Sequence, residues 1–338
     1  MITTQLRGGL ALLLGMLMSA IGITARADAA LGGPAVQRVQ GPLSVMVLGS
    51  GGPQLQTSGR ASAGYLVFTD GQPRVLMDLG GGTFQRIAQS GAHIGALDII
   101  LLSHLHIDHS EDLPAVIKGM YFDSRLQGSF RTAPFRVWGP GTDNPTMFPS
   151  VSEFTNDLFD ASGLFRYLES FVDGGGLGHF AYETHDLSPV FQGATIDTIL
   201  DEGGLVIKAI AVDHFEAPAI AYRIEYGGRS IVYSGDTHST TDNMINLAEG
   251  ADLLIYDTSI LDDRPPPQSP FAKRHTTPTR LGQVAAMANP AELVLSHLTP
   301  VSDPEVTAIK KIIRGQGYAG KISEALDLKV YNAGMVKE

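Results

Sequence analysis

The sequence predicts an α/β fold in which a sheet presents polar side chains at the ends of its strands. Four short, mostly apolar runs, residues 97–102, 206–212, 230–235 and 292–296, each lead into histidine or aspartate. Runs of this length bounded by polar residues are typical of buried strands. The 338-residue chain is 43% apolar and 17% charged, which is enough for a large buried core.

The most informative segment follows the first run. It reads Ser-His-Leu-His-Ile-Asp-His from Ser103 to His109. Side chains of an extended chain alternate between two faces, so His104 and His106 point the same way and can share one ion, while Asp108 and His109 turn toward a second. Imidazole and carboxylate ligands suit zinc and also accept iron or manganese. Solvated loop histidines are the alternative, but histidines rarely fall at this spacing after a strand by chance.

Three further candidate ligands follow the other runs. Asp213-His214 comes after residues 206–212, Asp236 after residues 230–235, and His297 after residues 292–296. One pattern therefore recurs four times, and we expect the strand ends to bring these side chains to a single site.

The order and spacing of these motifs resemble the metallo-β-lactamase superfamily, in particular its branch of ribonuclease Z and zinc-dependent arylsulfatases. The resemblance covers about residues 43–300. It implies an αββα sandwich, with two sheets packed face to face and helices outside, forming one hydrolase domain over residues 30–338. The matching segments are residues 49–53, 77–80, 103–109, 214, 221–223, 234–237, 275–277 and 295–300.

The resemblance also implies a centre with two zinc ions per chain, with manganese or iron as alternatives. Its ligands would be His104, His106 and His214 for one ion, Asp108, His109 and His297 for the other, and Asp236 as the bridge. Two ions about 3.5–4 Å apart lower the pKa of a shared water and stabilise charge on the attacked group and on the leaving oxygen. The implied chemistry is hydrolysis, with Asp108 and Asp236 counted as catalytic because they hold the ions.

His275 is implied to be catalytic without being a ligand. In the resembling families this histidine donates a proton to the leaving group or holds the substrate oxyanion. A glutamate in a His-Glu-Ala-Thr segment usually orients it, whereas here the matching residues 255–259 carry Asp257. Asp257 has one methylene less reach, but a carboxylate–histidine pair remains chemically sensible. The alternative is a surface histidine after the proline-rich loop at residues 265–267. Asp78 is implied to support the ligands from behind.

The first 29 residues have the features of a signal peptide. Arg7 precedes an uncharged apolar stretch at residues 8–24, and residues 25–29, Ala-Arg-Ala-Asp-Ala, offer cleavage sites after Ala27 or Ala29. This predicts a periplasmic or secreted protein with no membrane contact after cleavage. An uncleaved membrane anchor is the alternative.

Charge and cysteine content narrow the function further. A net charge of −11 does not attract polyanions, and only residues 224–233 separate Tyr222-Arg223 from the Ser-Gly-Asp segment, which leaves no room for the long arm of ribonuclease Z enzymes. Transfer RNA is therefore not expected as a partner.

The chain has no cysteine, which excludes disulfides and the zinc β-lactamase site that uses a cysteine ligand.

Residues 142–201 depart from the alternation of strands and helices, and we interpret them as an inserted helical cap. This segment is rich in glycine and phenylalanine. Its aromatic rings could form an apolar pocket over the metals, or could simply attach the insert to the core. The phenylalanines are Phe148, Phe154, Phe159, Phe165, Phe171, Phe180 and Phe191.

The leading hypothesis is an exported dinuclear zinc hydrolase of small anionic esters, most like the arylsulfatase-type members of the superfamily. The choice of sulfate rests on resemblance alone. The first alternative is a phosphodiesterase or ribonuclease Z-like endonuclease, the second is a lactonase, and the third is a metal-binding protein without catalysis. Homodimer formation stays open.

Overall fold

The computed structural model describes residues 34–126, 134–169 and 182–335. The predicted signal peptide, Phe171 and Phe180 lie outside these residues. Within them, no helix has the length and apolar character needed to cross a membrane.

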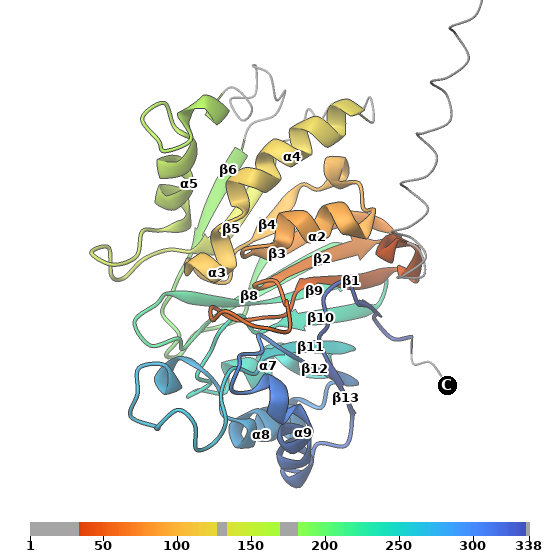
Figure 1. Ribbon diagram of the computed structural model, residues 1–338, viewed down its shortest axis with the longest axis vertical. Coiled ribbons are helices and arrows are strands. Elements are labelled where there is room, and N and C mark those ends of the chain that lie inside the picture. Colours follow the sequence, from red (N-terminus) through yellow and green to blue (C-terminus); the bar gives the residue numbers. More distant parts are fainter. Residues whose placement is uncertain (1–33, 127–133, 170–181, 336–338) are drawn as a thin grey trace, which may run out of the picture.

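Two seven-stranded sheets form the framework (Figure 1). The first has the order β14-β1-β2-β3-β4-β5-β6 and the second β13-β12-β11-β10-β9-β8-β7. In the first sheet the bounds are β1 Leu43–Gly49, β2 Gly64–Thr69, β3 Gln72–Leu79, β4 Ile99–Leu101, β5 Phe135–Pro140, β6 Tyr182–Leu187 and β14 Val330–Asn332. In the second they are β7 Asp197–Glu202, β8 Leu205–Val212, β9 Ala219–Tyr226, β10 Arg229–Tyr233, β11 Leu253–Asp257, β12 Glu292–Ser296 and β13 Lys321–Glu324.

Each sheet is antiparallel on one side and parallel on the other. In the first sheet the strands from β3 to β6 are parallel, and in the second the strands from β10 to β13 are parallel. Parallel strands end at the same edge of a sheet, so the segments that follow them meet there. This edge carries the candidate site.

Helices cover the outer faces of both sheets (Figure 1). On the first sheet they are α2 Thr83–Ser90, α3 Ile107–Ser110, α4 Leu113–Leu126 and α5 Val151–Phe159. On the second they are α7 Asn243–Ala248, α8 Pro278–Ala288 and α9 Val306–Gly315. Short 3-10 helices are η1 Ala35–Arg38, η2 Ile94–Ala96, η3 Arg166–Leu168, η4 Ala272–Arg274 and η5 Asp303–Glu305.

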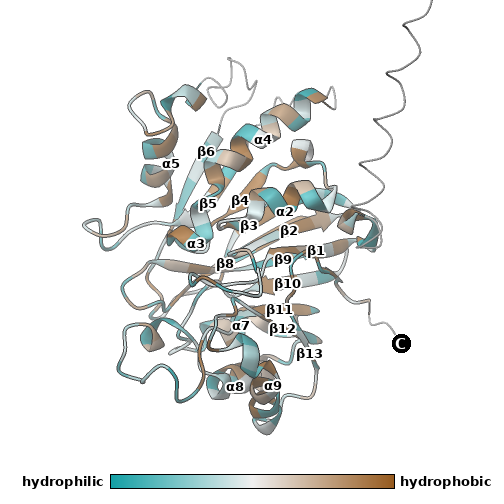
Figure 2. Cartoon of the chain, viewed as in Figure 1, coloured by the Kyte–Doolittle hydropathy of each residue, from teal (hydrophilic) through white to brown (hydrophobic). Residues whose placement is uncertain are grey.

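Three apolar clusters hold these four layers together. The middle cluster joins the facing sides of the two sheets and includes Tyr65 and Ile99 from the first and Tyr222 and Ile231 from the second. The other two clusters lie between each sheet and its helices. Central strands are therefore buried on both faces, and apolar residues recur along them (Figure 2). Each buried Leu, Ile or Phe stabilises the fold by about 1.5–3 kcal/mol. The predicted αββα sandwich is confirmed.

The segment predicted as a helical cap, residues 142–201, has a different structure. Only α5 and η3 are helical in its described part, and β6 and β7 are outer strands of the two sheets. Because β5 and β6 are parallel, α5 serves as part of the crossover that connects them. β6 and β7 have half-buried or exposed side chains throughout, so neither shows the apolar run by which the central strands were recognised.

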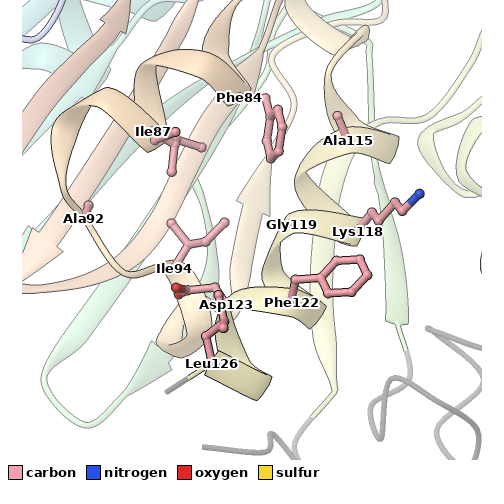
Figure 3. Close-up of a pocket in the computed structure, with 11 residues that line it drawn as sticks. Phe84, Ile87, Ala92, Ile94, Ala115, Lys118, Gly119, Phe122, Asp123 and Leu126 are labelled. Atoms are coloured by element: carbon pink, nitrogen blue, oxygen red, sulfur yellow. The ribbon is translucent and has the colours of Figure 1, made fainter. Parts of the chain in front are cut away.

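An apolar cavity of about 500 Å³ lies between α2 and α4 (Figure 3). Phe84 and Ile87 line it from α2, and Phe122 and Leu126 line it from α4. The candidate metal ligands are not among its lining residues, so this cavity is separate from the site described next.

Candidate metal centre

The seven predicted ligands converge at one edge of the two sheets. His104 follows β4, Asp108 and His109 lie on α3, His214 follows β8, and His297 follows β12. All except His106 are buried, and His106 is half-buried. Groups whose ligand atoms all lie within 4.8 Å of one another are His104, His106 and His214; Asp108, His109 and His297; and His104, His109 and Asp236.

The first two groups match the two sets of ligands that the resemblance implies. In the first, His106 Nδ1 lies 2.9 Å from His104 Nε2 and 3.3 Å from His214 Nε2. In the second, His297 Nε2 lies 3.1 Å from His109 Nε2 and 3.2 Å from Asp108 Oδ2. Ring nitrogens that face each other at such distances suit a shared cation.

Asp236 lies between the two groups. Its Oδ2 is 3.4 Å from His297 Nε2 and 3.5 Å from His109 Nε2 in one group, and 3.9 Å from His104 Nε2 and from His214 Nε2 in the other. Its Oδ1 is buried and has no hydrogen-bond partner. A buried carboxylate oxygen without a donor is costly unless a cation satisfies it. The residues present therefore fit divalent metal.

The charge states of four candidate ligands suit metal binding, whereas two others must lose a proton to a metal. Burial lowers the pKa of His104 and His214 well below the usual value, so both are neutral and have a free lone pair. Burial alone would raise the pKa of Asp236, but His297 and His109 outweigh it and hold that pKa well below its usual range. Asp108 has a lowered pKa for the same reason, with His109 as the main neighbouring charge. Both carboxyl groups are therefore anionic at neutral pH. Burial would lower the pKa of His109 and His297, but Asp236 and Asp108 outweigh it and raise both, so a bound cation displaces protons there.

Asp78 supports the cluster from behind. Its side chain is buried, and His109 Nδ1 lies 2.7 Å from its Oδ2. The same carboxylate accepts hydrogen bonds from the amide and hydroxyl of Ser103, both at 2.7 Å, and from the hydroxyl of Tyr233 at 2.6 Å. β3 and β4 pair in parallel with Met77 opposite Leu101, which brings Asp78 beside Ser103. Asp78 therefore fixes His109 with Nε2 turned toward the site.

Other ligands are held through their second ring nitrogen as well. His214 Nδ1 lies 2.8 Å from the main-chain oxygen of Arg274, and His297 Nδ1 lies 2.6 Å from Ser259 Oγ. Ser259 Oγ also donates to Asp257 Oδ1 at 2.5 Å. The sequence analysis did not identify Ser259, because a serine in an apolar segment has no distinguishing pattern.

His275 lies beside the ligands and is oriented by Asp257. Its side chain is buried, and its Nδ1 is 2.8 Å from Asp257 Oδ2. The ring centroid is 5.6 Å from that of His297, and the two rings are stacked. Asp257 and His275 also form a fourth cluster with Asp236 and His297. Asp257 accepts a hydrogen bond from Ser259 and orients the ring of His275. A carboxylate–histidine pair of this kind can hold or transfer a proton.

The other described histidines, His93, His185 and His238, belong to none of the groups that could hold a metal. His93 is exposed and pairs with Asp123, and the ring of His185 stacks on Trp138. His238 is half-exposed, with Nδ1 4.0 Å from a carboxylate oxygen of Asp213. His179 lies outside the described residues.

The phenylalanines of residues 142–201 take different places. Phe159 is buried in the core, and Phe154 and Phe191 pack against the apolar clusters. Phe165 is 37% exposed. Phe148 alone among those described has a ring contact with a candidate ligand, since its centroid lies 5.8 Å from that of His106. Among the described phenylalanines of this segment, Phe148 is therefore the one that the ring contacts support as part of the predicted aromatic pocket.

Asp78→Asn is expected to weaken zinc binding about 10- to 100-fold, because an asparagine cannot hold His109 as the carboxylate does. Asp78 has φ of 54°, a left-handed conformation that asparagine also tolerates, so the backbone should persist. Competition with a chromophoric chelator measures the dissociation constant. Asp70→Asn is a matched control, since Asp70 has φ of 47° on an exposed turn. Equal affinities in the two variants would contradict the role given to Asp78.

Comparisons with known proteins agree with this geometry. Residues 173–298 match the family model described as a Beta-lactamase superfamily domain. The chain is 29% identical to uncharacterized protein ML1173 of Mycobacterium leprae, covering 84% of this chain and 88% of that protein. It is 27% identical to ribonuclease Z of Mycobacterium bovis, covering 85% and 96%.

The fold likeness extends to solved structures. The short form of human tRNase Z superposes with a TM-score of 0.63 at 22% identity, covering 86% of this chain and 100% of that one. The sheet order and the edge at which the candidate ligands meet are consistent with the matched family model. The chain therefore contains a match to the Beta-lactamase superfamily domain and is similar to ribonuclease Z over 85% of its length.

Proposed function

We propose that the protein hydrolyses phosphodiesters with two zinc ions. The observation that carries this proposal is the position of Asp236 between two sets of ligands, in a chain that aligns over 85% of its length with a ribonuclease Z. The preference for sulfate esters is replaced by its alternative, because relatives that match this chain over most of its length are named ribonuclease Z. Zinc is chosen because the ligands are imidazole and carboxylate groups.

Each side chain has a defined task in this proposal. When bound, the two ions supply an activated water and stabilise negative charge on the phosphoryl oxygens. Asp236 and Asp108 bring the negative charge that keeps two cations together in a buried site. His275 donates a proton to the departing oxygen, and Asp257 holds its ring in position and stabilises its protonated form.

We propose a small diester rather than transfer RNA as the substrate. β9 and β10 pair as a hairpin from Tyr226 opposite Arg229, so no arm projects between them. The net charge of −11 adds to this argument, because recognition of a folded RNA depends on many cationic contacts with phosphates.

Export to the periplasm or the exterior is part of the proposal and rests on the apolar segment at residues 8–24. Expression of the full chain, cell fractionation and N-terminal sequencing test it. A mature N-terminus at Asp28 or Ala30 supports export, and an intact chain in the cytoplasmic fraction contradicts it.

The substrate is tested by comparing two chromogenic esters. Zinc-loaded protein is expected to hydrolyse bis(para-nitrophenyl) phosphate and to leave para-nitrophenyl sulfate largely intact. Both esters release the same phenol, so a difference in turnover does not come from the leaving group and instead reflects the phosphate or sulfate part of the substrate. Turnover of the sulfate alone would return the protein to the arylsulfatase interpretation.

A further inference from the structure

Phe215 is an exposed aromatic residue directly after the buried candidate ligand His214. Its side chain is 48% exposed, and its φ of 59° lies in the left-handed region that bulky residues rarely adopt. The amide of Phe215 donates to Asp213 Oδ1 at 3.1 Å, which helps to hold this turn. An exposed ring contributes little to the core, so core packing does not explain the strained conformation. Strain of this kind concentrates at binding and active sites.

Two cations lie against the ring of Phe215. Lys273 Nζ is 5.4 Å and Arg274 Cζ is 5.8 Å from its centroid. Both belong to η4, the segment that immediately precedes His275, and Arg274 also forms an ion pair with Glu216. The two cations therefore join the ring to the segment that carries His275, in a chain whose overall charge is −11.

A second aromatic ring lies in the same segment. Phe271 immediately precedes η4, and its centroid is 4.4 Å from that of His275. The main-chain oxygen of Arg274 lies 2.8 Å from His214 Nδ1. Residues 271–275 and Phe215 thus form one wall that touches both a candidate ligand and the candidate proton donor.

We propose that Phe215, with Lys273 and Arg274, forms a subsite for a planar aromatic group of the substrate. This inference rests on the proposed function and narrows it to aryl or nucleoside esters of phosphate rather than purely alkyl diesters. Aromatic groups stack on an exposed ring whatever their substituents. Lys273 and Arg274, which lie over the Phe215 ring, add positive charge for the electronegative substituents of such a group. The phosphate would lie at the metal ligands while the planar group stacks on Phe215.

Binding of two stable phosphonates to the zinc-loaded protein tests the subsite without turnover. Methylphosphonate and phenylphosphonate differ only in the aromatic group. We expect the wild type to bind phenylphosphonate about 3- to 10-fold more tightly in calorimetry. In Phe215→Leu the preference should fall to about 1- to 2-fold. Binding of phenylphosphonate should weaken, while binding of methylphosphonate should stay the same. Phe165→Leu is the matched control, because Phe165 is also an exposed phenylalanine, and it should keep the wild-type preference.

Phe215→Gly separates a binding role from a structural one. Glycine adopts left-handed φ readily, so this variant should melt at the same temperature as the wild type or higher while losing the preference for phenylphosphonate. A lower melting temperature together with an intact preference would overturn the subsite. Equal binding of the two phosphonates by the wild type would also overturn it and leave the proposed function standing. Failure of both phosphonates to bind zinc-loaded protein would overturn the proposed function and the subsite with it.

Discussion

Asp236→Asn is expected to remove at least one zinc ion and to lower kcat/KM for a phosphodiester by about 100-fold or more. Losing a partner that only orients a ligand costs about 10- to 100-fold in metal affinity or activity, and Asp236 is itself the carboxylate at which both sets of ligands meet. Asparagine keeps the size of the side chain and removes its charge. The loss of charge matters most because the site is buried and, under the proposed function, holds two cations.

Metal content and thermal stability provide two independent measurements for this variant. Elemental analysis gives the zinc bound per chain. The rise in melting temperature with added zinc reports the free energy by which zinc binding stabilises the folded chain. This free energy is about 2.7 kcal/mol when the free zinc concentration is 100 times the dissociation constant. Asp263→Asn makes the same change of charge at a side chain that is 82% exposed and should match the wild type in both. Full zinc content and full activity in Asp236→Asn would contradict the assigned role.

The convergence of the candidate metal ligands could be predicted from sequence because of where they lie in the fold. β4, β8 and β12 have mostly buried side chains, so each is visible as an apolar run, and His104, His214 and His297 come just after them. Local sequence therefore marks the strand, and the geometry of a sheet with parallel strands brings their ends together.

Other parts of the site depend on contacts that local sequence does not record. Tyr233 reaches Asp78 across the core between the sheets, and Ser259 joins Asp257 to His297. Serine and tyrosine are common in strands and loops, so only the folded chain reveals these contacts. The outer strands β6 and β7 were missed for a related reason, since half-exposed strands lack an apolar run.

Sulfate and phosphate esters could not be separated by the ligand pattern. The same seven side chains would bind metal for either reaction, and both reactions place anionic oxygens at the ions. The choice depends on the relatives and on the subsite proposed at Phe215 and residues 271–275.

His275→Ala is expected to slow hydrolysis of a diester with a poor leaving group by about 10²- to 10⁴-fold. A basic alkoxide leaves far more readily with a proton, and the proposed function assigns that proton to His275, whose Nδ1 lies 2.8 Å from Asp257 Oδ2. A para-nitrophenolate ion leaves without protonation, so bis(para-nitrophenyl) phosphate should be affected far less. The difference between the two esters is therefore the signature of a proton donor.

The measurement compares kcat/KM for a dinucleotide and for bis(para-nitrophenyl) phosphate, with zinc content determined on the same samples. Asp257→Asn should show the same selectivity in weaker form, because it leaves His275 in place but removes the carboxylate that stabilises its charged form. His93→Ala is the control, because this side chain is 67% exposed. It should leave kcat/KM unchanged for both esters. Equal slowing on both esters with loss of zinc would instead make His275 a ligand, which is the alternative that its closeness to Asp236 and His297 leaves for experiment.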